Sequence, residues 1–277
     1  MNDHPHMTLL VPDIAHRMVD VGGRKLSLSC RGTRAPTVVL ETGLGAESVE
    51  WAAVEHGVAP FARVFRYDRA GRGRSDPASH GRTAYDMVRD LHVLLRQAGI
   101  PGPYLLVGHS FGGLLARLFT YMHRSEVAGL ILVDSLHEDQ FEIFGPMFPP
   151  PAPNDPPALQ QARTFWTTGW RDPSSTAECI DFQASIAQGR AIESFGDLPL
   201  CVLTAGTFLN QSLIPVDRRE GLQELWDEMQ ARFTRLSSNV QQVYVPSSGH
   251  FLQRDQPQVV VDAIARMLTS IRSSAQP

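Results

Sequence analysis

The sequence has few cysteines, and they form no pattern typical of a disulfide framework or a metal site. Only three of its 277 residues are cysteine, and Cys30, Cys179 and Cys201 are widely spaced. Cys30 and Cys201 fall in apolar, strand-like runs, which predicts buried thiols. We therefore expect reduced cysteines, no bound metal and, by default, a cytoplasmic protein.

Long apolar runs and clusters of basic residues are also missing. Residues 1–12 contain one apolar run, Thr8–Val11, which is too short for a signal-peptide core or a membrane span. The 25 Lys and Arg residues against 29 Asp and Glu give a net charge of −4, and no basic run indicates nucleic acid or an anionic membrane as a partner. We expect a small-molecule substrate, and the composition predicts no particular oligomeric state.

What the chain does contain is a regular alternation of apolar runs and helical patterns. Strands are predicted at 16–21, 25–30, 37–40, 63–68, 104–107, 127–133, 200–203 and 240–245. Helices are predicted at 51–59, 84–98, 158–168, 177–189, 216–236 and 259–271, with one more directly after residue 110. This order predicts the α/β class, with a mostly parallel, twisted sheet of about eight strands and helices on both faces.

The most informative stretch is Gly108-His109-Ser110-Phe111-Gly112, between a predicted strand and a predicted helix. A serine on so tight a turn needs glycine two positions away on each side, and the following helix directs its N-terminal N–H groups at whatever binds there. Gly43, Leu44, Ser110 and Asp134 all follow predicted strands. Since ligands of parallel sheets bind beyond the carboxyl ends of the strands, these residues are expected at one edge.

Residues 136–197 differ in texture from the rest of the chain. Seven prolines lie between positions 146 and 157, and aromatic residues such as Phe141, Phe144 and Trp166 surround them. A polar linker would not carry so many aromatics, so we predict a cap that packs over the sheet edge. The domain prediction is a core of residues 1–135 and 198–277 and a cap of residues 136–197. A surface insertion with no role at the site is the alternative.

A serine hydroxyl needs a base to accept its proton. His250 is the best of the ten histidines, because it follows the last predicted strand on a loop, Pro246–Phe251, at the same edge. His137 is a weaker candidate. Three arginines at 69, 72 and 74 follow the strand at 63–68, but without phosphate-loop spacing they predict a structural loop with solvated or ion-paired side chains.

Taken together, GHSFGG, YDRAGRGRSD, LETGLG and SGHF resemble the α/β-hydrolase superfamily over nearly the whole chain except the cap. The resemblance implies that Ser110 is the nucleophile and His250 the base. It also implies that the backbone N–H groups of Leu44 and Phe111 form the oxyanion hole. Serine at position 110 disfavours epoxide and haloalkane hydrolysis, because relatives with those activities have aspartate there.

The acid departs from the commonest pattern of that family. Most members carry an aspartate just after the strand that follows the cap, but residues 205–210 contain no carboxylate. Some relatives place the acid one strand earlier, which here is Asp134. Asp134 is therefore the predicted third member of the triad, with Asp217 and Asp139 as alternatives.

The predicted reaction is hydrolysis of a small apolar or aromatic carboxylic ester, through an acyl-enzyme and without a cofactor. The same residues could cleave amides, lactones or carbon–carbon bonds next to a ketone, and a haloperoxidase side activity stays open. A non-catalytic small-molecule receptor on the same fold is the alternative from another class. The residues expected to bind the substrate are Gly43, His109, Phe141, Phe144, Trp166 and Phe251.

Overall fold

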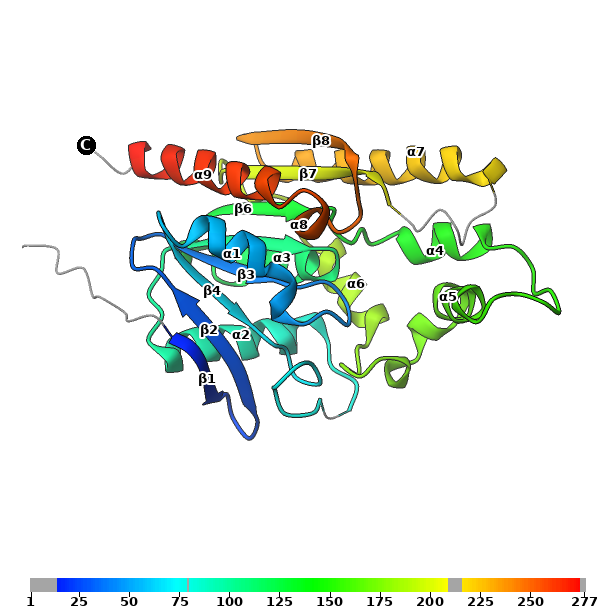
Figure 1. Ribbon diagram of the computed structural model, residues 1–277, viewed down its shortest axis with the longest axis horizontal. Coiled ribbons are helices and arrows are strands. Elements are labelled where there is room, and N and C mark those ends of the chain that lie inside the picture. Colours follow the sequence, from blue (N-terminus) through cyan, green and yellow to red (C-terminus); the bar gives the residue numbers. More distant parts are fainter. Residues whose placement is uncertain (1–13, 79, 209–215, 275–277) are drawn as a thin grey trace, which may run out of the picture.

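An eight-stranded sheet organises the chain, in the order β1-β2-β4-β3-β5-β6-β7-β8 (Figure 1). The computed structural model describes residues 14–78, 80–208 and 216–274, without the side chains of residues 14, 15, 216–218 and 220. The strands are β1 (Ile14–Asp20), β2 (Lys25–Arg31), β3 (Thr37–Glu41), β4 (Arg63–Tyr67), β5 (Tyr104–His109), β6 (Val127–Val133), β7 (Leu200–Thr207) and β8 (Val240–Gly249). β1 and β2 form an antiparallel hairpin against β4, and all other neighbours pair in parallel.

Helices cover both faces of the sheet. The α-helices of the described residues are α1 (Ala52–Val58), α2 (Ala84–Ala98), α3 (Phe111–Met122), α4 (Gln140–Phe144), α5 (Pro157–Thr167), α6 (Phe182–Arg190), α7 (Val216–Arg232), α8 (Leu252–Asp255) and α9 (Pro257–Ser274), and not all of them lie on the sheet. The central strands β3, β5 and β6 are almost completely buried and direct alternate residues to opposite faces, as parallel sheets require. Leu106 and Leu130 pack with α2 and α3, whereas Leu105 and Ile131 pack with α1 and α9. The predicted α/β class and parallel sheet are therefore confirmed.

Residues between β6 and β7 supply α4, α5 and α6, and Figure 1 shows α4 and α5 to one side of the sheet. Their aromatic side chains bury one another: Phe141 stacks on Trp170 with ring centroids 5.0 Å apart, and Phe144 lies 5.2 Å from Phe208. Burial of so much aromatic surface, rather than regular secondary structure, holds this proline-rich segment together.

Several predicted boundaries are wrong in informative ways. Residues 246–249, predicted as loop, continue β8, so the strand carries its chain almost to His250. The helix predicted at 177–189 begins only at Phe182, because the Asp181 side chain caps it by accepting from the Ala184 N–H at 2.9 Å. The short helices α4 and α8 have too few residues for their periodicity to be visible in the sequence.

The cysteine and membrane predictions can be compared with the described residues. Cys30 and Cys201 are buried as predicted, and burial raises the pKa of the Cys201 thiol to about 11. Across residues 14–78, 80–208 and 216–274, no helix combines the length and the apolar character that crossing a bilayer would require.

Candidate active site

Ser110 occupies a strained turn between β5 and α3. Its φ of 52° and ψ of −120° lie in a region that favours glycine. A Cβ on Gly108 would lie 2.4 Å from the Gly112 carbonyl oxygen, and one on Gly112 would lie 2.4 Å from that of Thr42. Both glycines are therefore sterically required, as the sequence predicts, and the bend holds Ser110 partly exposed at the N-terminus of α3.

Asp134 and His250 meet at the same edge of the sheet. The Nδ1 atom of His250 lies 2.6 Å from Oδ2 of Asp134, a carboxylate with no exposed surface. Asp134 directly follows β6 and also has a positive φ, 45°. Backbone strain of this kind persists only where the surroundings enforce it, and it is concentrated at functional sites.

The second carboxylate oxygen of Asp134 is held by two donors. The Trp226 indole N–H donates to Oδ1 at 2.8 Å, and the Ala205 backbone N–H donates at 3.0 Å. Both oxygens are thus satisfied, which orients Oδ2 towards the imidazole. Because Nδ1 of His250 is engaged by Asp134, Nε2 is the ring nitrogen left for Ser110.

The other carboxylates proposed for this position have different surroundings. Asp139 lies 2.9 Å from an Arg190 nitrogen and 3.1 Å from one of Arg232, in partly exposed ion pairs. The side chain of Asp217 lies outside the described part of the chain. His137, the weaker base candidate, accepts at Nδ1 from the Asp139 N–H at 3.1 Å. Of these described candidates, only His250 lines the same cavity as Ser110, and Asp134 is its carboxylate partner.

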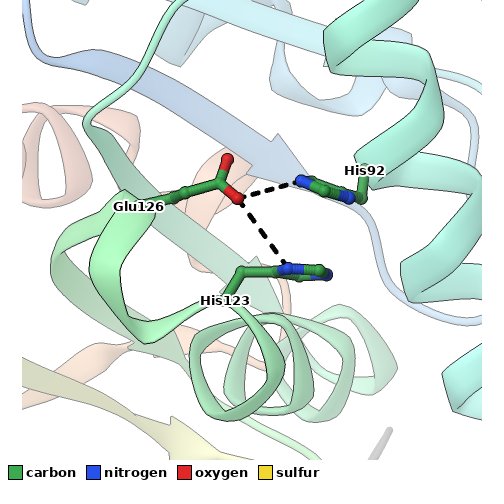
Figure 2. Close-up of side chains that lie close together, drawn as sticks. All are labelled: His92, His123 and Glu126. Atoms are coloured by element: carbon green, nitrogen blue, oxygen red, sulfur yellow. Dashed lines mark hydrogen bonds and ion pairs between the residues drawn. The ribbon is translucent and has the colours of Figure 1, made fainter.

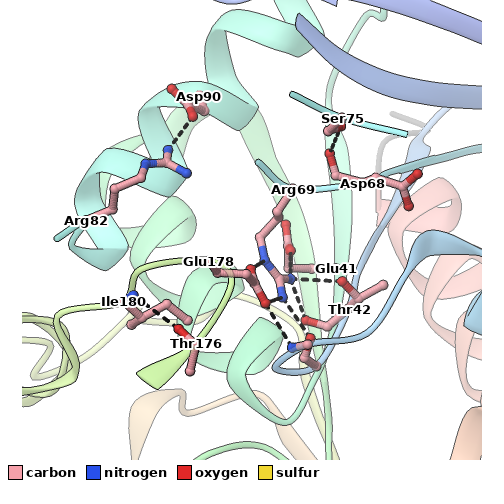
Figure 3. A network of polar contacts seen from close by, with 12 residues as sticks. Glu41, Thr42, Asp68, Arg69, Ser75, Arg82, Asp90, Thr176, Glu178 and Ile180 are labelled. Carbon is pink, nitrogen blue, oxygen red and sulfur yellow. Dashed lines mark hydrogen bonds and ion pairs between the residues drawn. The ribbon is translucent and has the colours of Figure 1, made fainter. Parts of the chain in front are cut away.

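The predicted oxyanion loop, residues 41–45, is fixed by the buried side chain of Arg69 (Figure 3). Arg69 donates to the Thr42 and Gly43 carbonyl oxygens, each at 2.7 Å. It also contacts Glu41 at 2.7 Å and, from the segment between β6 and β7, Glu178 at 2.6 Å. Glu178 in turn accepts the Gly45 N–H at 2.8 Å. The predicted ion pairing of this arginine loop is thus confirmed for Arg69.

These contacts leave two N–H groups available next to Ser110. The backbone on both sides of Leu44 is anchored, and its own N–H has no acceptor in the described chain. Phe111 is the first residue of α3, and the first N–H groups of a helix have no acceptor within it. Leu44 and Phe111 also line the same cavity as Ser110, which suits the predicted oxyanion donors.

The charges of this cluster depend on one another. Burial disfavours the charged form of Arg69, but the carboxylates of Glu178 and Glu41 outweigh it and hold its pKa above the ordinary value. Burial also raises the pKa of Glu41, although Arg69 and the Tyr67 hydroxyl counteract that effect. Each buried charge is therefore stabilised only while its partners remain.

We expect Glu178→Gln to destabilise the protein and to lower turnover. Removing one partner of a buried ion pair costs on the order of 3 kcal/mol, and here it also loosens the loop that carries Leu44. Urea denaturation and kcat would measure the two effects. Glu47→Gln is the matched control, since Glu47 is half-exposed and lies 3.7 Å from Arg72. Equal behaviour of the two variants would contradict the role given to Glu178.

A small apolar cavity of about 100 Å³ connects these parts. Ser110 and His250 contribute the reactive groups, and Gln140 contributes a polar amide among the described lining residues. The remaining lining residues are Leu44, Phe111, Leu136, Phe141, Phe165, Trp166 and Phe208. Phe141 and Trp166 were predicted to bind substrate, whereas Phe208 follows β7 and carried no sequence signal.

Four of the predicted substrate contacts, Gly43, His109, Phe144 and Phe251, are not among the described residues that line this cavity. The Gly43 carbonyl faces Arg69, and Phe251 packs beneath the guanidinium of Arg254, 3.7 Å from its ring centre. Phe144 lies one layer deeper, against Phe208. His109 is buried with its Nε2 atom 2.8 Å from the His250 carbonyl oxygen, so it contacts the backbone of the candidate base.

His109 makes stability depend on pH. Burial first, and then repulsion by His250, hold its pKa well below the ordinary 6.5. Below about pH 6.5 the unfolded chain therefore binds a proton that the folded chain does not, and stability falls as pH falls towards the folded pKa. We expect His109→Gln to flatten this decline in urea denaturation series, whereas exchange of the exposed His56 should not. Identical slopes in all three proteins would contradict this.

Comparison with known proteins bears on the fold that carries these residues. A family model described as alpha/beta hydrolase fold matches residues 36–165. The probable transporter EfuK of Hormonema carpetanum is 29% identical over 293 residues, covering 89% of this chain but only 42% of that protein. The uncharacterized protein YqjL of Bacillus subtilis is 25% identical over 252 residues, with 89% of both chains covered.

The solved structures extend the likeness to the whole sheet. The structure of a thermophilic esterase from Thermogutta terrifontis superimposes with a TM-score of 0.60 at 20% identity, covering 94% of this chain and 99% of that one. The superposition shows a shared fold. Because the sequence identity is so low, it does not show a shared reaction, which must be argued from the residues themselves.

Proposed function

We propose that this chain, which has the α/β-hydrolase fold and matches that family model over residues 36–165, is a serine hydrolase of small carboxylic esters, with Ser110, His250 and Asp134 as its triad. The observation that carries the proposal is the 2.6 Å contact between His250 Nδ1 and the buried Asp134 Oδ2. That contact lies next to a serine held on a strained turn in the same cavity wall. Nucleophile, base and orienting acid are the three parts that acyl transfer needs.

The proposed reaction has two halves. The Ser110 oxygen attacks the ester carbonyl while His250 Nε2 accepts the hydroxyl proton, and Asp134 stabilises the imidazolium that forms. The N–H groups of Leu44 and Phe111 bind the oxyanion, and His250 returns the proton to the departing alcohol. Water, deprotonated by His250, then attacks the acyl-enzyme, which releases the acid and regenerates Ser110.

The size and lining of the cavity support a small apolar substrate. About 100 Å³ is well below the 300–1,000 Å³ typical of sites for drug-sized ligands. An aromatic wall that includes Phe141, Phe165 and Trp166 excludes water and offers no partner for a charged group. We therefore propose a short acyl or aryl group as the part bound next to Ser110.

We also propose that residues 136–197 act as a cap on a core of residues 1–135 and 198–277. Four of the aromatic and polar lining residues, Gln140, Phe141, Phe165 and Trp166, come from this segment. Glu178, from the same segment, contacts the Arg69 cluster below Leu44. The segment thus contributes both to the cavity wall and to the support of the oxyanion loop.

An ester panel tests the proposal. We expect p-nitrophenyl acetate and butyrate to be hydrolysed with higher kcat/KM than the octanoate, and Trp166→Ala to shift that preference towards longer chains by opening the wall. Amides, lactones and aryl ketones assayed in parallel separate the other bond types. Tight binding of a small molecule with no turnover of any substrate would instead favour a receptor and overturn the proposal.

A further inference from the structure

Two imidazoles and a carboxylate come together far from Ser110 (Figure 2). His92 lies on α2, His123 follows the last residue of α3, and Glu126 precedes β6. Since Ser110 precedes the first residue of α3, a helix of about 18 Å separates the two sites. The candidate ligand atoms of the three side chains all lie within 4.8 Å of one another.

The donor atoms converge on one carboxylate oxygen. Nε2 of His92 lies 3.0 Å from Oε1 of Glu126, and Nδ1 of His123 lies 3.8 Å from the same oxygen. Ligands about 2.0–2.1 Å from a tetrahedral zinc ion are roughly 3.3 Å from each other, between these two values. The two nitrogen-to-oxygen separations are therefore close to the ligand–ligand distance of a zinc site.

His123 has unused bonding capacity in this arrangement. The 3.8 Å separation is too long for a hydrogen bond from Nδ1, and Nε2 is buried without a partner in the described chain. With its proton on Nε2, this ring has its lone pair on Nδ1, the nitrogen that faces Glu126. A neutral imidazole with a free lone pair is the form that binds metals.

We propose that His92, His123 and Glu126 bind one divalent zinc ion. Two imidazole nitrogens and one carboxylate oxygen form a donor set that suits zinc, and three protein ligands leave a position for water. The two rings are stacked with centroids 3.8 Å apart and planes 21° apart, so they must open for both lone pairs to reach the ion. Both histidine side chains are 19% exposed, which leaves room for that rotation.

Such an ion would join α2 to the turn between α3 and β6. Binding to the folded chain alone raises stability by mass action. At zinc concentrations a hundred times the dissociation constant, we expect Tm to rise by about 5 °C, and removal of zinc by a chelator should reverse the change.

Calorimetric titration of the tag-free full chain with zinc chloride tests the site. His4 and His6 near the N-terminus are a second possible source of zinc binding, so the reference protein is the His4→Gln, His6→Gln double variant. In that background we expect one zinc ion per chain, and a loss of affinity of at least tenfold on His123→Gln or on Glu126→Gln. Glu126 is partly exposed, so its exchange keeps the test valid if His123→Gln does not fold.

Two results would overturn the proposal. The first is no zinc binding by the reference protein. The second is binding whose affinity and stoichiometry stay the same in His92→Gln, His123→Gln and Glu126→Gln. Zinc-dependent protection from heating that is lost in these variants, while ester hydrolysis stays at the reference level, would support a structural ion separate from the active site.

Discussion

Replacing Ser110 with alanine is expected to lower ester turnover by about 10⁶-fold, to the level left by substrate binding and the oxyanion donors. No other described side chain at the cavity offers a hydroxyl to His250. Labelling by a fluorophosphonate, which needs an activated serine, should disappear in the same variant. His250→Gln should slow labelling while leaving the serine in place. Label that persists on Ser110→Ala would rule out this nucleophile.

Substitutions of Ser110 are expected to affect activity and stability in opposite directions. At a φ of 52°, serine and alanine both carry a Cβ that the backbone disfavours, whereas glycine does not. Ser110→Gly should therefore be inactive and yet more stable than the wild type, by about 1–2 kcal/mol in urea denaturation. A Ser110→Gly variant less stable than Ser110→Ala would contradict the idea that this turn stores strain.

The parts of the site that sequence predicts well are those with a local signature. Gly108 and Gly112 mark the turn because close packing excludes any side chain there, and apolar runs on either side identify the strand and the helix. Asp134 and His250 could be predicted because each follows a strand, and strand ends meet at one edge of the sheet. In a parallel sheet, a residue's position just after a strand is enough to predict that it lies at this edge.

Contacts that depend on tertiary packing had no such signature. Trp226 falls within the helix predicted at 216–236, where the apolar pattern says nothing of its N–H group, yet that N–H donates to the Asp134 carboxylate. Arg69 and Glu178 are 109 residues apart, and only folding shows that they are partners. Both cases involve a polar atom on a buried side chain, whose hydrogen-bond partner no periodicity identifies.

The aromatic segment, residues 136–197, is predicted only in part from the sequence. Its composition predicts correctly that residues 136–197 pack against something, because so many exposed rings would be unfavourable in water. Which rings reach the cavity depends on the path of a proline-rich chain with short helices. Phe141 and Trp166 reach it and Phe144 does not, although all three have the same kind of side chain.

Asp134→Asn is expected to lower turnover by about 10⁴-fold while leaving the protein folded. The amide oxygen of asparagine can still accept from Trp226 and the Ala205 N–H, which now donate to Oδ1. Its NH₂ group then faces Nδ1 of His250, where Oδ2 lies in the wild type. An amide donor selects the imidazole tautomer with its proton on Nε2, and that tautomer cannot accept the proton of Ser110.

Asp139→Asn is the matched control for this substitution. Asp139 is the described alternative acid, and its carboxylate is paired with Arg190 and Arg232 in partly exposed contacts. Exchange there should change kcat by less than about twofold, because exposed ion pairs contribute little. Turnover that survives in a folded Asp134→Asn protein, or is lost in Asp139→Asn, would assign the acid to a different residue. Since an isosteric amide preserves the packing around Trp226, loss of activity without loss of stability would isolate the carboxylate's effect on His250.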